Sequence, residues 1–292
     1  MPWQHLLAPQ PRLPAAALDL WYARLLEHLG EASAFELALL GGRLAATPGL
    51  AFLAGYQGAL RALWPSAPAS LGALCVTENR STRPADMATR LDGLTLTGRK
   101  DFVTAAEAAD WLLVAARTEA AGELPRLALC VVHNGAPGVR IEPLPALPLM
   151  PDIGHARLHL EQASCELLAG DGWEAYVKPF RTLEDLHVLT AISAWLLGVA
   201  QEQAWPQELR LRLLGLLAGC AEVARQPAAQ PATHLLLAGL FAQFAALHGE
   251  LDNAFAAGPA ELATVWRRDG KLLEIARGPR AKRLEKAWAA WT

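Results

Sequence analysis

The sequence predicts an α+β protein in which an N-terminal helical region, an antiparallel β-barrel or sandwich and a C-terminal helical bundle follow one another. Two observations predict this order. Residues 14–62 and the chain from residue 183 onward are rich in good helix formers at helical spacing, whereas residues 71–168 contain short β-type runs separated by turn signals. We place the boundaries at residues 1–70, 71–174 and 175–292.

The bulk composition limits the classes of protein to which the chain can belong. Its 292 residues are 53% hydrophobic and 19% charged, which is typical of a globular protein with a sizeable core. A net charge of −3 argues against a general nucleic-acid binder. We see no secretory signal and no uninterrupted apolar stretch of the roughly 20 residues that span a bilayer. The four cysteines are far apart and without CxxC spacing. We therefore expect a soluble, cytoplasmic protein with reduced cysteines and no membrane or nucleic-acid partner.

The N-terminal region predicts three helices. Leucine and aromatic residues between positions 18 and 29 fall on one face of an amphipathic helix, and residues 34–40 indicate a second. Pro48-Gly49 breaks the run, and residues 50–63 read as a third helix that contains two unfavourable glycines. These elements make up the predicted N-terminal helical domain.

The central region predicts several short strands. The close spacing of the β-type runs indicates an antiparallel barrel or sandwich. The candidate strands are residues 74–77, 94–97, 111–116, 128–132, 139–141 and 157–160.

The C-terminal region predicts long helices joined by short breaks, which is typical of an antiparallel bundle. The expected helices are residues 183–203, 207–225, 232–255 and 260–291, the last interrupted at Gly278-Pro279.

The central region also resembles the acyl-CoA dehydrogenase family. The family's V-T-E-P segment, its D-G … G-x-K-x-[FWY]-[IV]-[TS]-x-A segment and its A-D-x-x-L-V-x-A-R-T strand all have counterparts at the corresponding places. These are Cys75-Val76-Thr77-Glu78, Asp92-Gly93 with Gly98-Arg99-Lys100-Asp101-Phe102-Val103-Thr104-Ala105-Ala106, and Ala109-Asp110-Trp111-Leu112-Leu113-Val114-Ala115-Ala116-Arg117-Thr118.

The resemblance implies a β-barrel between two helical domains and a bound FAD, whose reduced ring would be stabilised by fixed N–H and O–H donors. It also implies an acyl-CoA substrate oxidised at its α,β C–C bond, and a homodimer or homotetramer. By position, the residues that it places near the flavin ring are Val76, Thr77, Phe102, Val103 and Thr104.

The chain departs from the family pattern at several places. The family's T-E-P-x-x-G-S-D becomes Thr77-Glu78-Asn79-Arg80-Ser81-Thr82-Arg83-Pro84-Ala85-Asp86, which lacks the glycine that lets the backbone approach a ligand. The R-x-x-F-G and Q-x-x-G-G-x-G-Y segments, which help to hold the FAD pyrophosphate of a neighbouring subunit, have no counterpart.

The catalytic base is a further departure. Many family members carry it as the glutamate of I-Y-E-G-T, where this chain has Arg277, and arginine cannot accept a proton. A minority carry the base at the start of the first helix after the barrel, and Glu184 falls there. We take Glu184 as the candidate base, although residues 182–185 also read as a helix N-terminus where the helix dipole favours acidic residues.

Two functions follow from these observations. The first is an FAD-dependent oxidoreductase of acyl-CoA dehydrogenase type. The second is a non-catalytic relative that serves as a partner-binding or oligomerisation module. No metal site is expected, because His155 and His159 lie on a predicted strand without further ligands and read as solvated or cross-strand residues.

Overall fold

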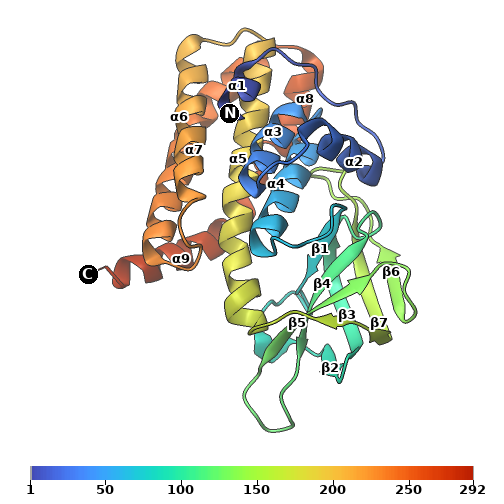
Figure 1. Ribbon diagram of the computed structural model, residues 1–292. Helices are drawn as coiled ribbons and strands as arrows, with labels where there is room; N and C mark the ends of the chain where they lie inside the picture. Colours follow the sequence, from blue (N-terminus) through green and yellow to red (C-terminus); the bar gives the residue numbers. More distant parts are fainter. Residues whose placement is uncertain (1, 292) are drawn as a thin grey trace.

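The computed structural model describes residues 2–291 and confirms the α+β class. A group of helices from both ends of the chain lies beside a single curled sheet, and the long α5 runs from the sheet to the far end of the helices (Figure 1). The helices are α1 Pro2–Leu7, α2 Leu18–Leu29, α3 Ala34–Leu44, α4 Pro48–Leu63, α5 Lys178–Glu202, α6 Gln207–Val223, α7 Pro231–Ala256, α8 Ala260–Asp269 and α9 Arg277–Ala289.

The N-terminal helices begin at local capping signals. Ser33 and Glu36 form a reciprocal capping box at the start of α3. Thr47 caps α4, and Pro48 is its first residue instead of a breaker. Proline is tolerated there because the first N–H groups of a helix have no partner within it. The predicted break between the two helices lies at residues 45–47, and the helix expected from residue 50 begins two residues earlier.

Helix α4 packs closely on α5 because glycine replaces a side chain at the crossing. A Cβ atom on Gly55 would lie 2.7 Å from the carbonyl oxygen of His187. Glycines lower the helix propensity of α4, but they permit close contact between the two helices. The favourable packing at this contact offsets the low propensity.

Helix α5 begins earlier than the sequence predicts. A π-helical turn, η2 Gly172–Val177, leads directly into α5 at Lys178. Glu184 therefore lies beyond the first turn of the helix, where an acidic residue gains little from the helix dipole. The interpretation of residues 182–185 as a helix N-terminus is wrong.

The last helical stretch is interrupted at a different place from the one predicted. Helix α8 ends at Asp269, the short helix η3 Leu272–Glu274 follows, and α9 starts at Arg277. Gly278 and Pro279 lie in the first turn of α9, where proline removes no hydrogen bond.

The sheet is mixed, whereas the sequence predicted an antiparallel one. Its order is β6-β7-β3-β2-β4-β5-β8, and β1 pairs with β4 in parallel. Most other pairs are antiparallel, and among the described residues β6 and β8 end the path, so the sheet curls without closing. The strands are β1 Gly72–Cys75, β2 Arg90–Asp92, β3 Thr95–Thr104, β4 Trp111–Arg117, β5 Leu127–His133, β6 Val139–Pro143, β7 His155–Ser164 and β8 Glu166–Leu167.

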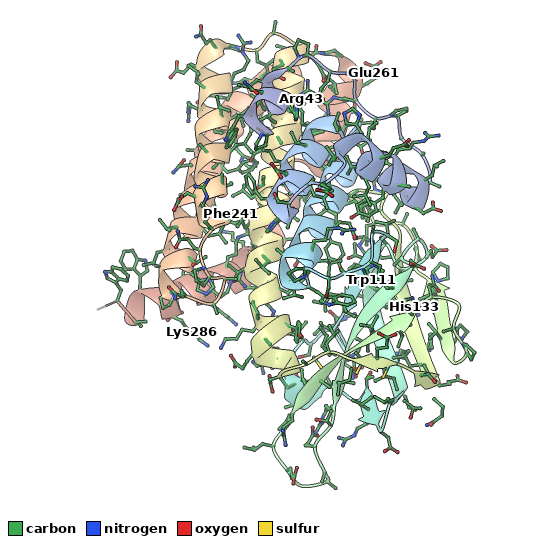
Figure 2. The ribbon with its side chains drawn as sticks, in the orientation of Figure 1. Arg43, Trp111, His133, Phe241, Glu261 and Lys286 are labelled. Carbon is green, nitrogen blue, oxygen red and sulfur yellow. The ribbon has the colours of Figure 1, made fainter. Side chains whose placement is uncertain are left out.

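Helices from both ends of the chain share one hydrophobic core, and Trp21 and Trp195 are both fully buried in it. A second core lies on one face of the sheet. A third joins sheet and helices, with Tyr56, Trp111 and Phe180 among its members (Figure 2). The fold therefore brings α4, α5 and the sheet into direct contact.

Two helical segments are long and apolar enough to cross a membrane by length and composition. The most apolar window of residues Gly172–Glu202 is 89% buried, and that of Pro231–Ala256 is 28% buried. Both segments contain charged residues, so neither is an uninterrupted apolar stretch, and the expectation of no membrane partner stays a prediction. The first segment has the burial of an ordinary core helix.

Candidate active site

A cavity of about 290 Å³ lies where the sheet meets helices from both ends of the chain. Glu184, the candidate base, and two of the predicted flavin-contacting residues, Phe102 and Thr104, line this one cavity. The other lining residues are mainly apolar, as is usual for a small-molecule site. They are Phe52, Leu147, Met150, His155, Asp185, Val188, Leu272, Leu273, Ile275, Ala276 and Arg280.

The carboxyl group of Glu184 is the acidic group whose properties best suit proton transfer. Burial, together with the neighbouring Asp185, raises its pKa to about 7, and Arg283 and Arg181 act in the opposite direction. A carboxylate that gains basicity through burial is suited to accept a proton near neutral pH. The position of Glu184 in the cavity and its raised pKa are those expected of a general base.

Asp185 ties α9 to α5 beside this cavity. Its carboxylate accepts a hydrogen bond of 3.0 Å from Arg280 and a second one from Arg283. Arg280 also lies over the ring of Phe241 on α7, 3.9 Å from the ring centre. These contacts fix the wall that η3 and α9 form against the cavity.

The predicted cofactor-binding residues occupy different environments. Phe102 is 40% exposed and Thr104 is half-buried, and both face the cavity. Val103 is fully buried in the core of the sheet, and Val76 packs in the core between sheet and helices. Thr77 accepts a hydrogen bond from the backbone N–H of Asp101 through its carbonyl oxygen. The structure therefore brings Phe102 and Thr104 together with Glu184 and leaves the other three outside the cavity lining.

The loop after β1 is held by a buried ion pair. Lys100 Nζ lies 2.5 Å from Glu78 Oε1, and both side chains are almost inaccessible. Glu78 also accepts hydrogen bonds from the backbone N–H groups of Ala88 and Thr89. Burial opposes ionisation of Glu78, but Lys100 and these donors outweigh it and lower its pKa. Glu78 thus joins the start of the loop that departs from the family pattern to the backbone just after its end, and Lys100 holds it against β3.

Several residues of the cavity were not found from the sequence. Leu147 and Met150 come from the segment between β6 and β7, which is fixed where Asp269 accepts a 2.9 Å hydrogen bond from the Met150 N–H. Asp269 lies far away in sequence, so no local pattern could reveal this contact. His155 was interpreted as a solvated or cross-strand residue, and the structure instead buries it beside this cavity. No group of residues suited to a metal occurs within residues 2–291.

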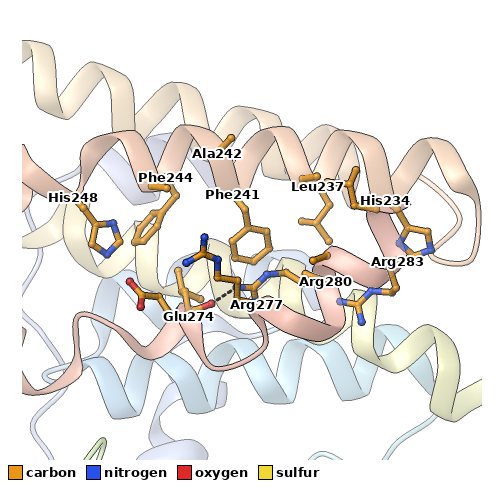
Figure 3. A pocket seen from close by; sticks show the side chains of 15 residues that line it. His234, Leu237, Phe241, Ala242, Phe244, His248, Glu274, Arg277, Arg280 and Arg283 are labelled. Carbon is orange, nitrogen blue, oxygen red and sulfur yellow. Dashed lines mark hydrogen bonds between the residues drawn. The ribbon is translucent and has the colours of Figure 1, made fainter. Parts of the chain in front are cut away.

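A wider groove of about 670 Å³ runs between α7 and α9 (Figure 3). Phe241 and Phe244 contribute apolar walls, and Arg277 lies along the opposite side. Leu273 and Arg280 line both this groove and the smaller cavity. Arg277, which the sequence resemblance aligns with the family's usual base, therefore faces the groove and is absent from the lining of the cavity that contains Glu184.

Comparison with known proteins agrees with the fold. Residues 73–163 match the family model of the acyl-CoA dehydrogenase middle domain. The fold is similar to butyryl-CoA dehydrogenase from Megasphaera elsdenii (TM-score 0.64, 14% identity, 94% of this chain and 88% of that chain covered). It is also similar to dibenzothiophene monooxygenase from Paenibacillus sp. A11-2 (TM-score 0.67, 16% identity, 94% and 88% covered).

A third similar structure is FkbI, described for biosynthesis of a methoxymalonyl extender unit (TM-score 0.64, 23% identity, 91% of this chain and 88% of that chain covered). A search of curated protein sequences gave no significant match. The structural likenesses show the fold, and the family model covers the central domain. Residues 73–163 thus match the acyl-CoA dehydrogenase middle domain, as the motifs predicted, and the fold of the whole chain is similar to that of butyryl-CoA dehydrogenase.

The raised pKa of Glu184 predicts how stability depends on pH. Its pKa is about 7 in the folded chain against an ordinary 4.5, so the folded state binds more protons between these values. The free energy of unfolding therefore falls as pH rises through this range. We expect Glu184→Gln to be more stable than the wild type by about 1–3 kcal/mol at about pH 8, and this difference to vanish below about pH 4.

Urea unfolding at the two pH values measures this difference. A Glu184→Gln variant that is no more stable than the wild type at the higher pH would contradict the raised pKa.

Proposed function

We propose that this protein is a flavin-dependent oxidoreductase that oxidises the α,β C–C bond of an acyl thioester, with Glu184 as the base. The observation that carries the proposal is the position of Glu184, whose pKa is raised to about 7, in the same cavity as Phe102 and Thr104. Similarity of the fold to butyryl-CoA dehydrogenase supports the substrate class.

The residues of the cavity fit a flavin ring. Phe102 offers an exposed aromatic side chain and Thr104 a hydroxyl group, and most other lining residues are apolar. A planar ring with polar edges suits such a surface. When bound, a flavin accepts a hydride from the β-carbon of a substrate. We assign Phe102 and Thr104 to holding the flavin. Contacts of Val76, Thr77 and Val103 with it stay predictions.

The chain's own groups provide the remaining chemistry. Glu184 removes the α-proton as its carboxylate form, which is substantially populated near neutral pH because its pKa is about 7. Apolar side chains of Leu272, Leu273 and Val188 line the same cavity as Glu184, and such surroundings favour the neutral acid and so make the carboxylate more basic. The ion pairs between Asp185 and the arginines of α9 hold this apolar wall in place.

The visible absorbance spectrum of the purified protein, before and after addition of excess FAD, tests the proposal. We expect a flavin band that survives gel filtration. A folded sample that retains no flavin contradicts the proposal and favours the alternative, a non-catalytic partner-binding module.

A further inference from the structure

A separate pocket is surrounded by cationic side chains. It has a volume of about 390 Å³ and lies where the starts of α5 and α7 meet the second half of α9. Lys178 and Arg181 of α5 line it together with Arg283 and Lys286 of α9, and Figure 2 labels Lys286 on α9. Among the described residues 2–291, no aspartate or glutamate belongs to this lining. We call it the cationic pocket.

The contacts of the arginines leave positive charge in excess beside the cationic pocket. Asp185 accepts hydrogen bonds from both Arg280 and Arg283, so one carboxylate serves two guanidinium groups. Arg181 donates a hydrogen bond to the hydroxyl group of Thr82, which is neutral. These partners therefore do not balance the charge of the three arginines.

The two lysines of the pocket differ in their partners. Lys178 forms an exposed ion pair of 2.8 Å with Glu174. Lys286 is exposed, and within residues 2–291 its side chain forms no ion pair or hydrogen bond. It follows Arg283 by three residues and so lies on the same face of α9. Lys286 can therefore bind a ligand in the pocket without losing another contact.

The cations around the pocket repel one another. Burial and the neighbouring Arg283 lower the pKa of Arg181, against the attraction of Glu184. Burial also lowers the pKa of His234, which lines the same pocket, and Arg283 and Lys178 lower it further. His234 and Arg283 lie at the same end of the groove in Figure 3. Like charges held close together cost free energy, and an anion between them offsets this cost.

The two arginines of the pocket remain accessible to a ligand. A guanidinium group has five N–H donors, and within residues 2–291 Arg181 and Arg283 donate one hydrogen bond each. The side chain of Arg283 is 19% exposed, and Arg181 is half-buried. Arg181 also lies over the ring of Trp173, 5.4 Å from its centre, and this contact helps to hold its position.

These features suit a phosphate group. Guanidinium groups bind phosphate through parallel hydrogen bonds, and a phosphate carries more negative charge than a carboxylate. Helix α7 begins at Pro231, which also lines the pocket, and the positive end of its dipole adds to the attraction of an anion. The volume is within the range of small-molecule sites, so an organic phosphate has room beside Trp173.

We propose that the cationic pocket binds the phosphate group of a small-molecule ligand through Arg181, Arg283 and Lys286. The phosphate is either a free one or part of a nucleotide. The pocket shares no lining residue with the cavity that contains Glu184, and the proposal does not depend on the proposed function.

Isothermal titration calorimetry of the full chain with inorganic pyrophosphate and with ADP, in a phosphate-free buffer of physiological ionic strength, tests the proposal. The variants are Arg181→Gln and Lys286→Gln. Lys282→Gln is the matched control, because Lys282 is an exposed cation of α9 that does not line the pocket. Urea unfolding selects the folded variants, and Lys286→Gln keeps the test available if Arg181→Gln does not fold.

We expect saturable binding of pyrophosphate by the wild type. Arg181→Gln should weaken it by about ten- to hundredfold, the effect of lost hydrogen bonds between charged groups, and Lys286→Gln by about three- to tenfold. Lys282→Gln should change the affinity by less than about twofold, because exposed charges at a distance are screened. Tighter binding of ADP than of pyrophosphate would assign the site to a nucleotide, and equal or weaker binding of ADP to a free phosphate.

Other outcomes overturn the proposal. If the folded wild type binds neither probe saturably, the cations form a solvated surface and no phosphate site. Losses in Lys282→Gln as large as those in Lys286→Gln would show attraction by the overall charge of α9 and no specific pocket. A chain that binds pyrophosphate but no flavin would keep this site and contradict only the proposed function.

Discussion

Replacement of Glu184 by glutamine is expected to slow flavin reduction by acyl thioesters by about 10²–10⁴-fold, while the bound flavin is retained. Glutamine has almost the same shape but cannot accept the α-proton. Because Glu184 is the cavity residue whose pKa is raised to about 7, its loss removes the group best suited to this step. Anaerobic stopped-flow absorbance with straight-chain acyl-CoA thioesters of increasing length measures the rate.

The matched control is Glu261→Gln, which changes an exposed glutamate at the start of α8, away from the cavity (Figure 2). It should reduce flavin at the wild-type rate. If Glu184→Gln also reacts at the wild-type rate, the base lies elsewhere and the assignment of Glu184 is refuted.

Replacement of Lys100 by methionine is expected to destabilise the fold by about 3–5 kcal/mol. Lys100 is fully buried and is the cation that lies 2.5 Å from the Glu78 carboxylate. Methionine conserves much of the volume but leaves Glu78 buried without a counter-charge. Urea unfolding measures the loss, and the double variant Lys100→Met with Glu78→Gln should recover part of it because no buried charge remains.

Lys178→Met is the matched control because Lys178 and Glu174 form a pair of 2.8 Å whose side chains are 55% and 62% exposed. Removal of an exposed pair should cost less than about 1 kcal/mol. An equally small loss in Lys100→Met would show that the buried pair contributes no more than a surface one.

Elements with strong local patterns were predictable from the sequence. Residues 18–29 coincide with α2, and the expected helix at residues 207–225 differs from α6 only at its end. Boundaries were missed where packing overrides propensity. The turn η2, which contacts β5, extends α5 backward to Lys178 through tertiary packing. The start of α4 at Pro48 was missed for a different reason, because the local cap at Thr47 was not recognised.

The strands of the sheet were also predicted only in part from the sequence. The alternating pattern at residues 94–97 revealed part of β3, which continues to Thr104. The parallel pairing of β1 with β4 was missed because both strands are buried along almost their whole length, and such strands have no period-two pattern that reveals a partner or a direction.

The sequence by itself determined the α+β class, the resemblance of the central region to the acyl-CoA dehydrogenase family, and the choice of Glu184 over Arg277 as candidate base. These features depend on residue type and on spacing along the chain. Only the tertiary structure decided that Glu184, Phe102 and His155 share one cavity. It did so because burial and the pKa of a carboxyl group depend on residues far apart in the sequence.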